Sequence, residues 1–112
     1  RFAQNLVVLM LVRIVKLTFK KEELPEFYSE FQTHKNKIAS FPGCQGMKLL
    51  KGIDDPTVIM TYSHWDNQEA LNRYRESDLF LGLWTKIKPM FGNKPEAWSH
   101  EIHFNGFKES KT

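Results

Sequence analysis

The stretch TYSHWDNQEALNRYRESD, residues 61–78, decides the fold, because within it the chain changes from the period of a strand to the period of a helix. In its first part successive side chains point to opposite faces of a predicted strand, so that Thr61 and Trp65 share one face. Asp66 or Asn67 can then accept hydrogen bonds from the free N–H groups of a helix's first turn. The sequence therefore predicts a strand that runs directly into a helix.

The helix after this strand is one of three amphipathic helices that the spacing of apolar residues predicts. The first covers residues 20–41, where Pro25 fits the first turn and the FPG sequence ends the helix. A second helix follows Asn67, and a third, with Asp78 as its predicted cap, runs to Lys88. The predicted inner faces consist of Leu24, Phe27, Phe31 and Ile38 in the first helix, Ala70, Leu71 and Tyr74 in the second, and Leu79, Leu83, Trp84 and Ile87 in the third.

Four strands complete the predicted fold. They cover residues 11–19, 44–52, 57–65 and 96–104. The IDDP sequence between the second and third strands favours a hairpin turn. This order of elements predicts an α+β fold, a ferredoxin-like sandwich with a four-stranded antiparallel sheet and helices on one face. Met47, Leu50 and other apolar strand residues need a cover on the second face, so we expect a homodimer packed sheet to sheet.

Composition indicates one domain over residues 1–112, with a core at 11–104 and an N-terminal extension at 1–9. The net charge of +3 comes from scattered basic residues, which argues against a nucleic-acid partner. The apolar run 6–12 is too short to span a bilayer, so no membrane partner is expected. The single cysteine, Cys44, has no partner for an internal disulfide, and a cytoplasmic location is the expectation.

Three large aromatic residues, Trp65, Tyr74 and Trp84, surround the predicted junction of strand and helix. Rings on strand ends and apolar helix faces usually fill a core, but they also offer a stacking surface for a flat ligand. Both interpretations stay open at this point. Arg13 is similarly ambiguous: it can pair with Glu101 across the sheet or supply a positive charge to an anionic ligand.

The sequence predicts no metal site. His100 and His103 are three positions apart on a predicted strand, so their rings lie on opposite faces of the sheet. Cys44 has no basic neighbour in sequence that would activate its thiol, and we expect it to be buried and inert.

The element order, the FPGCQG turn at residues 41–46 and the stretch at 61–78 together resemble the antibiotic biosynthesis monooxygenase family of dimeric α/β barrels. The resemblance covers residues 11–104. It implies a dimeric barrel in which each copy holds a pocket between sheet and helices. The family includes oxygenases of aromatic polyketides, quinol oxygenases, heme-degrading enzymes, signal-processing enzymes and members with no assigned activity, so the reaction has to be argued from the site.

Family members that oxygenate aromatic polyketides without metal or flavin carry an Asn, a Trp and a Tyr at three positions. Here the resemblance places Thr61, Trp65 and Leu71 at these positions, so only the Trp is retained. A substrate anion would also need a positive or hydrogen-bonding group, for which Arg13, His64 and the hydroxyls of Thr61 and Tyr62 are candidates. The resemblance favours the strand face of Trp65, which Thr61 shares, so we expect Trp65, Thr61 and Arg13 to be catalytic.

The heme-degrading members carry an Asn, a Trp and a His ligand at positions that read Val15, Tyr74 and Trp84 here. Without an imidazole at the third position, heme degradation is the weakest of the three interpretations. We expect Tyr74, Trp84, Val15 and Leu71 to bind substrate instead.

The function that the sequence favours is a cofactor-independent monooxygenase acting on a small aromatic, polyketide-like or quinol-like substrate. Such an enzyme uses O2 and no cofactor, because an electron-rich substrate anion itself donates the electron. The alternative is a non-oxygenase of the same fold, a small-molecule binding or stress-response barrel, since two of the three polyketide-site residues differ.

Overall fold

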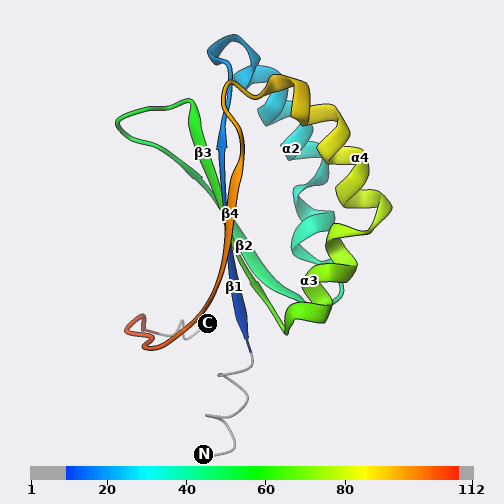
Figure 1. Cartoon of the computed structure of the whole chain (residues 1–112), viewed down its shortest axis with the longest axis vertical. Helices are drawn as coiled ribbons and strands as arrows, with labels where there is room; N and C mark the ends of the chain where they lie inside the picture. Colours follow the sequence, from blue (N-terminus) through cyan, green and yellow to red (C-terminus); the bar gives the residue numbers. More distant parts are fainter. Residues whose placement is uncertain (1–9, 109–112) are drawn as a thin grey trace, which may run out of the picture.

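The computed structural model describes residues 10–108 and has a four-stranded antiparallel sheet covered by helices on one face (Figure 1). The elements in chain order are β1 (Leu11–Thr18), the 3-10 helix η1 (Lys21–Glu23), α2 (Leu24–Ala39), β2 (Cys44–Lys51), β3 (Val58–Trp65), α3 (Gln68–Arg75), α4 (Asp78–Ile87), the 3-10 helix η2 (Lys88–Met90) and β4 (Glu96–Glu101). The strand order in the sheet is β2-β3-β1-β4. The predicted ferredoxin-like α+β fold is confirmed.

Strand register decides which side chains face the helices. Leu17 on β1 lies opposite Ile59 on β3, and both are buried under α2 and α4. Two residues along, Val15 lies opposite Thr61 and points to the same side. The core between sheet and helices consists of Leu17, Phe19, Phe27, Ile38, Ile59, Leu83, Ile87 and Met90.

A second, smaller cluster lies where β3 runs into α3. Trp65, Ala70 and Leu71 are buried there, with Phe41 and Tyr74 packed against them. The strand and the helix are thus joined by their own side chains. The predicted junction of strand and helix is confirmed at this position.

Helices α3 and α4 each begin with a side-chain cap. Asn67, and not Asp66, caps α3, because its side-chain oxygen accepts the Ala70 N–H at 2.9 Å. The prediction that Asp78 caps α4 is wrong. Ser77 is the cap: its hydroxyl oxygen accepts the Phe80 N–H at 3.1 Å, while Asp78 is the first helical residue.

Three other expectations need correction. Strand β4 ends at Glu101, so the predicted strand does not reach residue 104. Met47 lies opposite Ser63 on the helix side of the sheet, and so does not belong to the uncovered face. Arg13 lies opposite Ser99, whereas Glu101 lies opposite Leu11, so the expected pair of Arg13 with Glu101 does not form.

No helix of the described residues covers the other face of the sheet (Figure 1). The C-terminal segment reaches this face at one point, where the Lys48 Nζ lies 5.8 Å from the centroid of the Phe107 ring. Leu50 is 45% exposed and Trp98 is 40% exposed. Both belong to this face, because Leu50 lies opposite Met60 and Trp98 opposite Ile14. The predicted extension at residues 1–9 lies outside the described residues.

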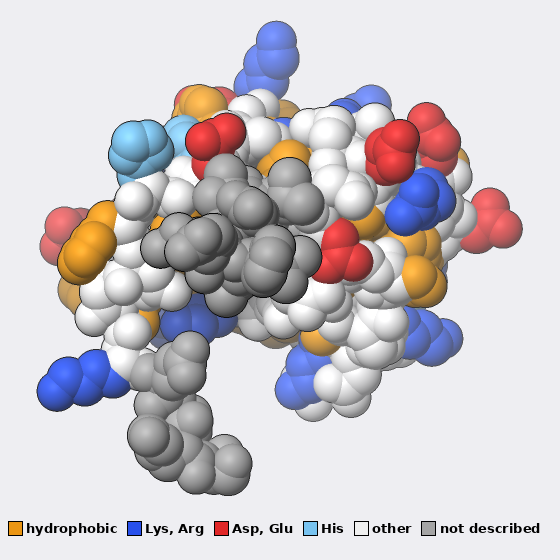
Figure 2. Space-filling view, turned by 90° about the horizontal axis from the view of Figure 1, so that it is seen from below, with side chains coloured by type: hydrophobic (Ala, Val, Ile, Leu, Met, Phe, Trp, Pro, Cys, Tyr) orange, Lys and Arg blue, Asp and Glu red, His pale blue; other side chains and the backbone are white. Residues whose placement is uncertain are grey.

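No helix in residues 10–108 is long and apolar enough to cross a membrane. At the end of the molecule shown in Figure 2, acidic and basic side chains of the described residues are interspersed around its edge.

Candidate functional site

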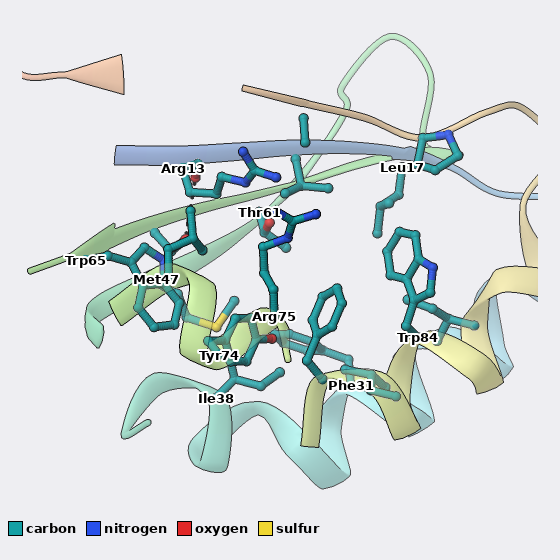
Figure 3. A pocket seen from close by; sticks show the side chains of 18 of the residues that line it. Arg13, Leu17, Phe31, Ile38, Met47, Thr61, Trp65, Tyr74, Arg75 and Trp84 are labelled. Carbon is teal, nitrogen blue, oxygen red and sulfur yellow. Dashed lines mark hydrogen bonds between the residues drawn. The ribbon is translucent and has the colours of Figure 1, made fainter. Parts of the chain in front are cut away.

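A cavity of about 320 Å³ lies between the sheet and helices α2, α3 and α4 (Figure 3). Its volume is at the lower end of the range for ligand pockets, roughly 300 to 1,000 Å³. Its walls include all seven of the residues selected from the sequence, which are Arg13, Val15, Thr61, Trp65, Leu71, Tyr74 and Trp84. Three exposed lining residues, Arg75, Glu96 and Ala97, place its opening between α3 and β4.

Trp65 forms the wall at the end of β3 and is only 1% exposed. Its indole N–H donates to the Ser63 hydroxyl at 2.9 Å, so the polar edge of the ring is satisfied inside the protein. The Tyr74 ring lies 4.9 Å from the Trp65 ring, centroid to centroid, at an interplanar angle of 30°. Trp65 is therefore both a core residue and a wall of the cavity.

A row of aromatic rings continues from Tyr74 along the helices. The Tyr74 and Phe80 rings are 5.2 Å apart and meet edge to face, and the Phe80 and Trp84 rings are stacked 5.6 Å apart. The Ser77 hydroxyl fixes the corner between α3 and α4: it donates to the Tyr74 carbonyl at 2.6 Å and caps the helix that carries Phe80. The chain thus presents a series of rings to the cavity.

Burial and the nearby Cys44 raise the pKa of the Tyr74 phenol well above its usual value. Tyr74 is therefore protonated at neutral pH and serves the cavity as a neutral ring with a hydroxyl. Burial, together with the negative charge of Asp66, also raises the pKa of the half-buried Cys44 thiol, against an opposing hydrogen bond to Gly46. A protonated thiol is a poor nucleophile.

Two arginines bring positive charge to this mainly apolar cavity. Arg13 on β1 donates from Nη1 to the Ser99 hydroxyl on the neighbouring strand at 3.0 Å. Burial and the positive charge of Arg75 lower the pKa of Arg13, although it stays protonated at neutral pH. Arg75 extends from the end of α3 toward the sheet, in the direction of Thr61 (Figure 3).

Several residues of the cavity were not selected from the sequence. Ser63, Arg75 and Phe80 are the three that contribute hydrogen bonding, charge and stacking. Ser63 was detectable, since it shares the strand face of Trp65 and Thr61. Arg75 was not, because an arginine at the end of a helix usually faces solvent.

The described residues do not suit a metal or a heme ligand set. Within residues 10–108 no group of three His, Cys, Asp or Glu side chains lies close enough to hold a metal ion. The chain's four histidines all fall in this range, and none of them lines the cavity. His64 lies on the opposite face of the sheet, with its Nε2 2.9 Å from the Tyr62 hydroxyl.

The sequence model of the antibiotic biosynthesis monooxygenase family matches residues 10–83. The chain belongs to this family. The match includes β1, β3 and α3, and therefore the strand-to-helix junction that forms one end of the cavity. No curated protein matches the chain by sequence.

Solved structures with the same fold share little sequence with this family member. A conserved protein from Methanosarcina mazei Go1 has a TM-score of 0.82 at 15% identity, over 88% of this chain and 97% of that chain. A mutant of SnoaB, a cofactor-independent oxygenase from Streptomyces nogalater, has a TM-score of 0.77 at 18% identity, over 89% of this chain and 99% of that chain. At these identities the likeness establishes the fold.

Proposed function

We propose that this family member is a cofactor-independent monooxygenase that acts on a small aromatic, polyketide-like or quinol-like substrate. One observation carries the proposal: the aromatic rings of Trp65, Tyr74 and Trp84 and the guanidinium of Arg13 line the same cavity. Rings suit a flat substrate, and a fixed positive charge favours its ionised form. SnoaB, which has the same fold, is a cofactor-independent oxygenase.

In the proposed reaction the substrate supplies the electrons. A phenol, anthrone or hydroquinone loses a proton, and its anion donates an electron to O2. Recombination of the two radicals and loss of water convert a CH2 group, present in an anthrone and in the keto tautomer of a phenol or hydroquinone, and O2 into a carbonyl group and H2O, so no external reductant is required. The protein binds the flat molecule, favours its anion and excludes water.

The residues have separate roles in this proposal. Arg13 stabilises the substrate anion, Thr61 donates a hydrogen bond to it, and Trp65 holds the reacting ring against the end of β3. Tyr74 and Trp84 supply stacking surfaces, while Val15 and Leu71 complete the apolar walls. All seven positions line the cavity, which supports a common ligand site.

The uncovered sheet face supports a homodimer as the working form of the enzyme. It carries exposed apolar side chains, among them Leu50 and Trp98. A second copy packed sheet to sheet would remove these side chains from water.

Oxygen uptake by chelator-treated protein tests the proposed function. We expect uptake with at least one member of a panel of reduced naphthols, anthrones and quinols. Trp65→Phe should lower kcat/KM at least tenfold, which corresponds to about 1.4 kcal/mol of transition-state stabilisation.

Because Trp65 is also a core residue, its variant needs a control of similar stability. Ile59→Val is suitable: Ile59 is fully buried but does not line the cavity, and loss of one methyl group costs roughly 0.5–1.5 kcal/mol. If Ile59→Val loses as much activity as Trp65→Phe, the effect comes from stability and the assigned role of Trp65 is wrong. An absence of uptake over the whole panel would contradict the oxygenase proposal.

Thr61 and Leu71 favour a second candidate function, ligand binding without oxidation. They stand at two of the three positions that the resemblance associates with polyketide oxygenation. In this case aromatic ligands would bind in the same cavity, and calorimetry would show binding without any consumption of oxygen.

A further inference from the structure

The positive charges of Arg13 and Arg75 have no counter-ion within the described residues. Neither guanidinium lies within 4.0 Å of a carboxylate in residues 10–108, where the ion pairs found join Glu30 to His34 and to Lys86. Arg13 uses one N–H group on Ser99, and Arg75 makes no side-chain hydrogen bond to a described residue. Most of the donors of the two guanidinium groups are therefore available to a ligand.

The two charges act on the same space. Both residues line the cavity, one from the sheet and one from the helix layer, and their guanidinium groups extend toward Thr61 between them (Figure 3). The field of Arg75 reaches Arg13, where it opposes protonation. Glu96, at the rim, is the one acidic residue that lines the cavity, so the lining carries two positive charges against one negative charge.

Like charges beside apolar walls are unfavourable, and a bound anion would relieve the repulsion. The walls next to them belong to aromatic rings, so the anion is expected to be attached to a flat ring system. A cavity of about 320 Å³ suits a ligand of two or three fused rings rather than a large one.

We propose that Arg13 and Arg75 together bind the carboxylate of a planar aromatic acid, and that the substrate of this cavity belongs to that class. The inference rests on the proposed function only in taking the cavity as the substrate site.

A carboxylate fits this pair better than a phenol does. It is ionised at neutral pH before it binds, so it compensates the positive charges without first releasing a proton. Its two oxygens lie in one plane and accept parallel hydrogen bonds from a guanidinium, a geometry in which Arg is the preferred partner. A phenol that is protonated at neutral pH offers one oxygen and no charge.

Calorimetric titration of the full chain with 2-naphthoate and with 2-naphthamide tests the proposal. The two probes share ring system and shape, and only the first is charged. We expect naphthoate to bind at least tenfold more tightly than the amide, and its affinity to fall as salt is raised. Equal affinities, or binding of neither probe, overturn the proposal.

Variants separate the proposed site from the general attraction of a basic protein for anions. Arg75→Gln and Arg13→Gln should each weaken naphthoate binding at least tenfold and leave amide binding within about twofold. Arg73→Gln is the matched control, because Arg73 lies on the same helix as Arg75 and carries the same charge but does not line the cavity. If Arg73→Gln weakens binding as much as Arg75→Gln, the proposed pair is wrong. Arg75 is exposed at the end of α3, so its variant is expected to fold even if Arg13→Gln does not.

The oxygen-uptake panel distinguishes this proposal from the proposed function. Preference for naphthoate with no uptake from any aromatic substrate would support the two-arginine site and contradict the oxygenase. Oxygen uptake with neutral naphthols, together with equal affinity for naphthoate and naphthamide, would support the oxygenase and contradict the two-arginine site.

Discussion

At the scale of single residues, Trp65 shows why core and site cannot be separated in this protein. Its ring is buried, its N–H is satisfied by Ser63, and it still forms a wall of the cavity. A ring that packing already holds in place loses little conformational entropy when a ligand binds beside it. The same packing that stabilises the junction of β3 and α3 therefore prepares the candidate site.

Tyr74 gives a prediction about stability and pH. Burial raises the pKa of its phenol above the usual value of 10.0 in the folded protein. Above that pH the unfolded chain has lost the proton while the folded protein keeps it, so the free energy of unfolding should fall as pH rises, by up to about 1.4 kcal/mol per pH unit. The contribution is fully present below pH 10. Urea unfolding of the parent and of Tyr74→Phe between pH 8 and pH 11 measures it.

The comparison with Tyr62→Phe controls for tyrosine ionisation in general. Tyr62 lies on the other face of the sheet and hydrogen-bonds His64. We expect Tyr74→Phe to flatten the loss of stability above pH 10 and Tyr62→Phe to change it less. Identical pH dependence of the parent and Tyr74→Phe would mean that the buried phenol does not control this loss.

Strand alternation and aromatic spacing predict part of the cavity lining from the sequence, whereas the lining residues that depend on tertiary structure could not be predicted. Thr61 and Trp65 are four positions apart on one strand, so their side chains lie on the same face of the sheet, and placing one in the cavity places the other there as well. Arg75 has the sequence context of an exposed residue at the end of a polar helix. Only the packing of α3 against the sheet directs its side chain toward the cavity. No local signal distinguishes it from Arg73.

At the scale of elements, the turn between α2 and β2 fixes where α3 packs. Gly43 has φ of 92°, and a Cβ atom built on it would lie 2.5 Å from the Ala70 Cβ on α3. The Gly43 carbonyl also accepts the Asp66 N–H at 2.9 Å, just before α3 begins. The absence of a side chain at this position lets the helix that carries Tyr74 approach the sheet.

Gly43→Ala should therefore destabilise the protein by about 2–4 kcal/mol, from the unfavourable φ and from the clash with Ala70. Gly82→Ala is the matched control, because Gly82 lies inside α4 and its added Cβ would meet nothing within 4 Å. There the alanine should stabilise the protein by roughly 0.5–1 kcal/mol, since it reduces the freedom of the unfolded chain. Urea unfolding of both variants measures the difference, and a similar effect of the two substitutions would contradict the close approach.

The elements themselves were largely predictable, and their ends were not. Apolar spacing identifies each helix face, and Phe27 and Ile38 are buried as expected. The start of α4 was misplaced by one residue, because Ser77 and Asp78 are both good caps and only the observed bond to the Phe80 N–H distinguishes them. Strand β4 ends early because residues 102–104 have no pairing partner on β1, which begins at Leu11 opposite Glu101.

At the scale of the whole molecule, the helices cover one face of the sheet, and no helix of the described residues covers the other face (Figure 1). The order of elements was enough to predict this arrangement, since helices that follow strands in this pattern return to the same side. Apolar residues on the second face indicate that it needs a cover, but they do not identify the cover, because their alternation is the same whether they meet a second copy or another polypeptide segment.

A change of Leu50 tests the proposed dimer. If the sheets of two copies pack together, each dimer buries two Leu50 side chains, one from each copy. Burying one Leu side chain contributes roughly 1.5–3 kcal/mol. Light scattering of the parent should then give a mass of twice 13.2 kDa, and Leu50→Arg should shift the protein toward monomer at concentrations where the parent stays dimeric. Leu81→Arg is the control, because Leu81 is 49% exposed, close to the 45% of Leu50, but lies on α4, away from the uncovered face. If the parent is monomeric at every concentration, the proposed dimer is wrong. If Leu81→Arg dissociates as readily as Leu50→Arg, the two copies do not pack through this face of the sheet.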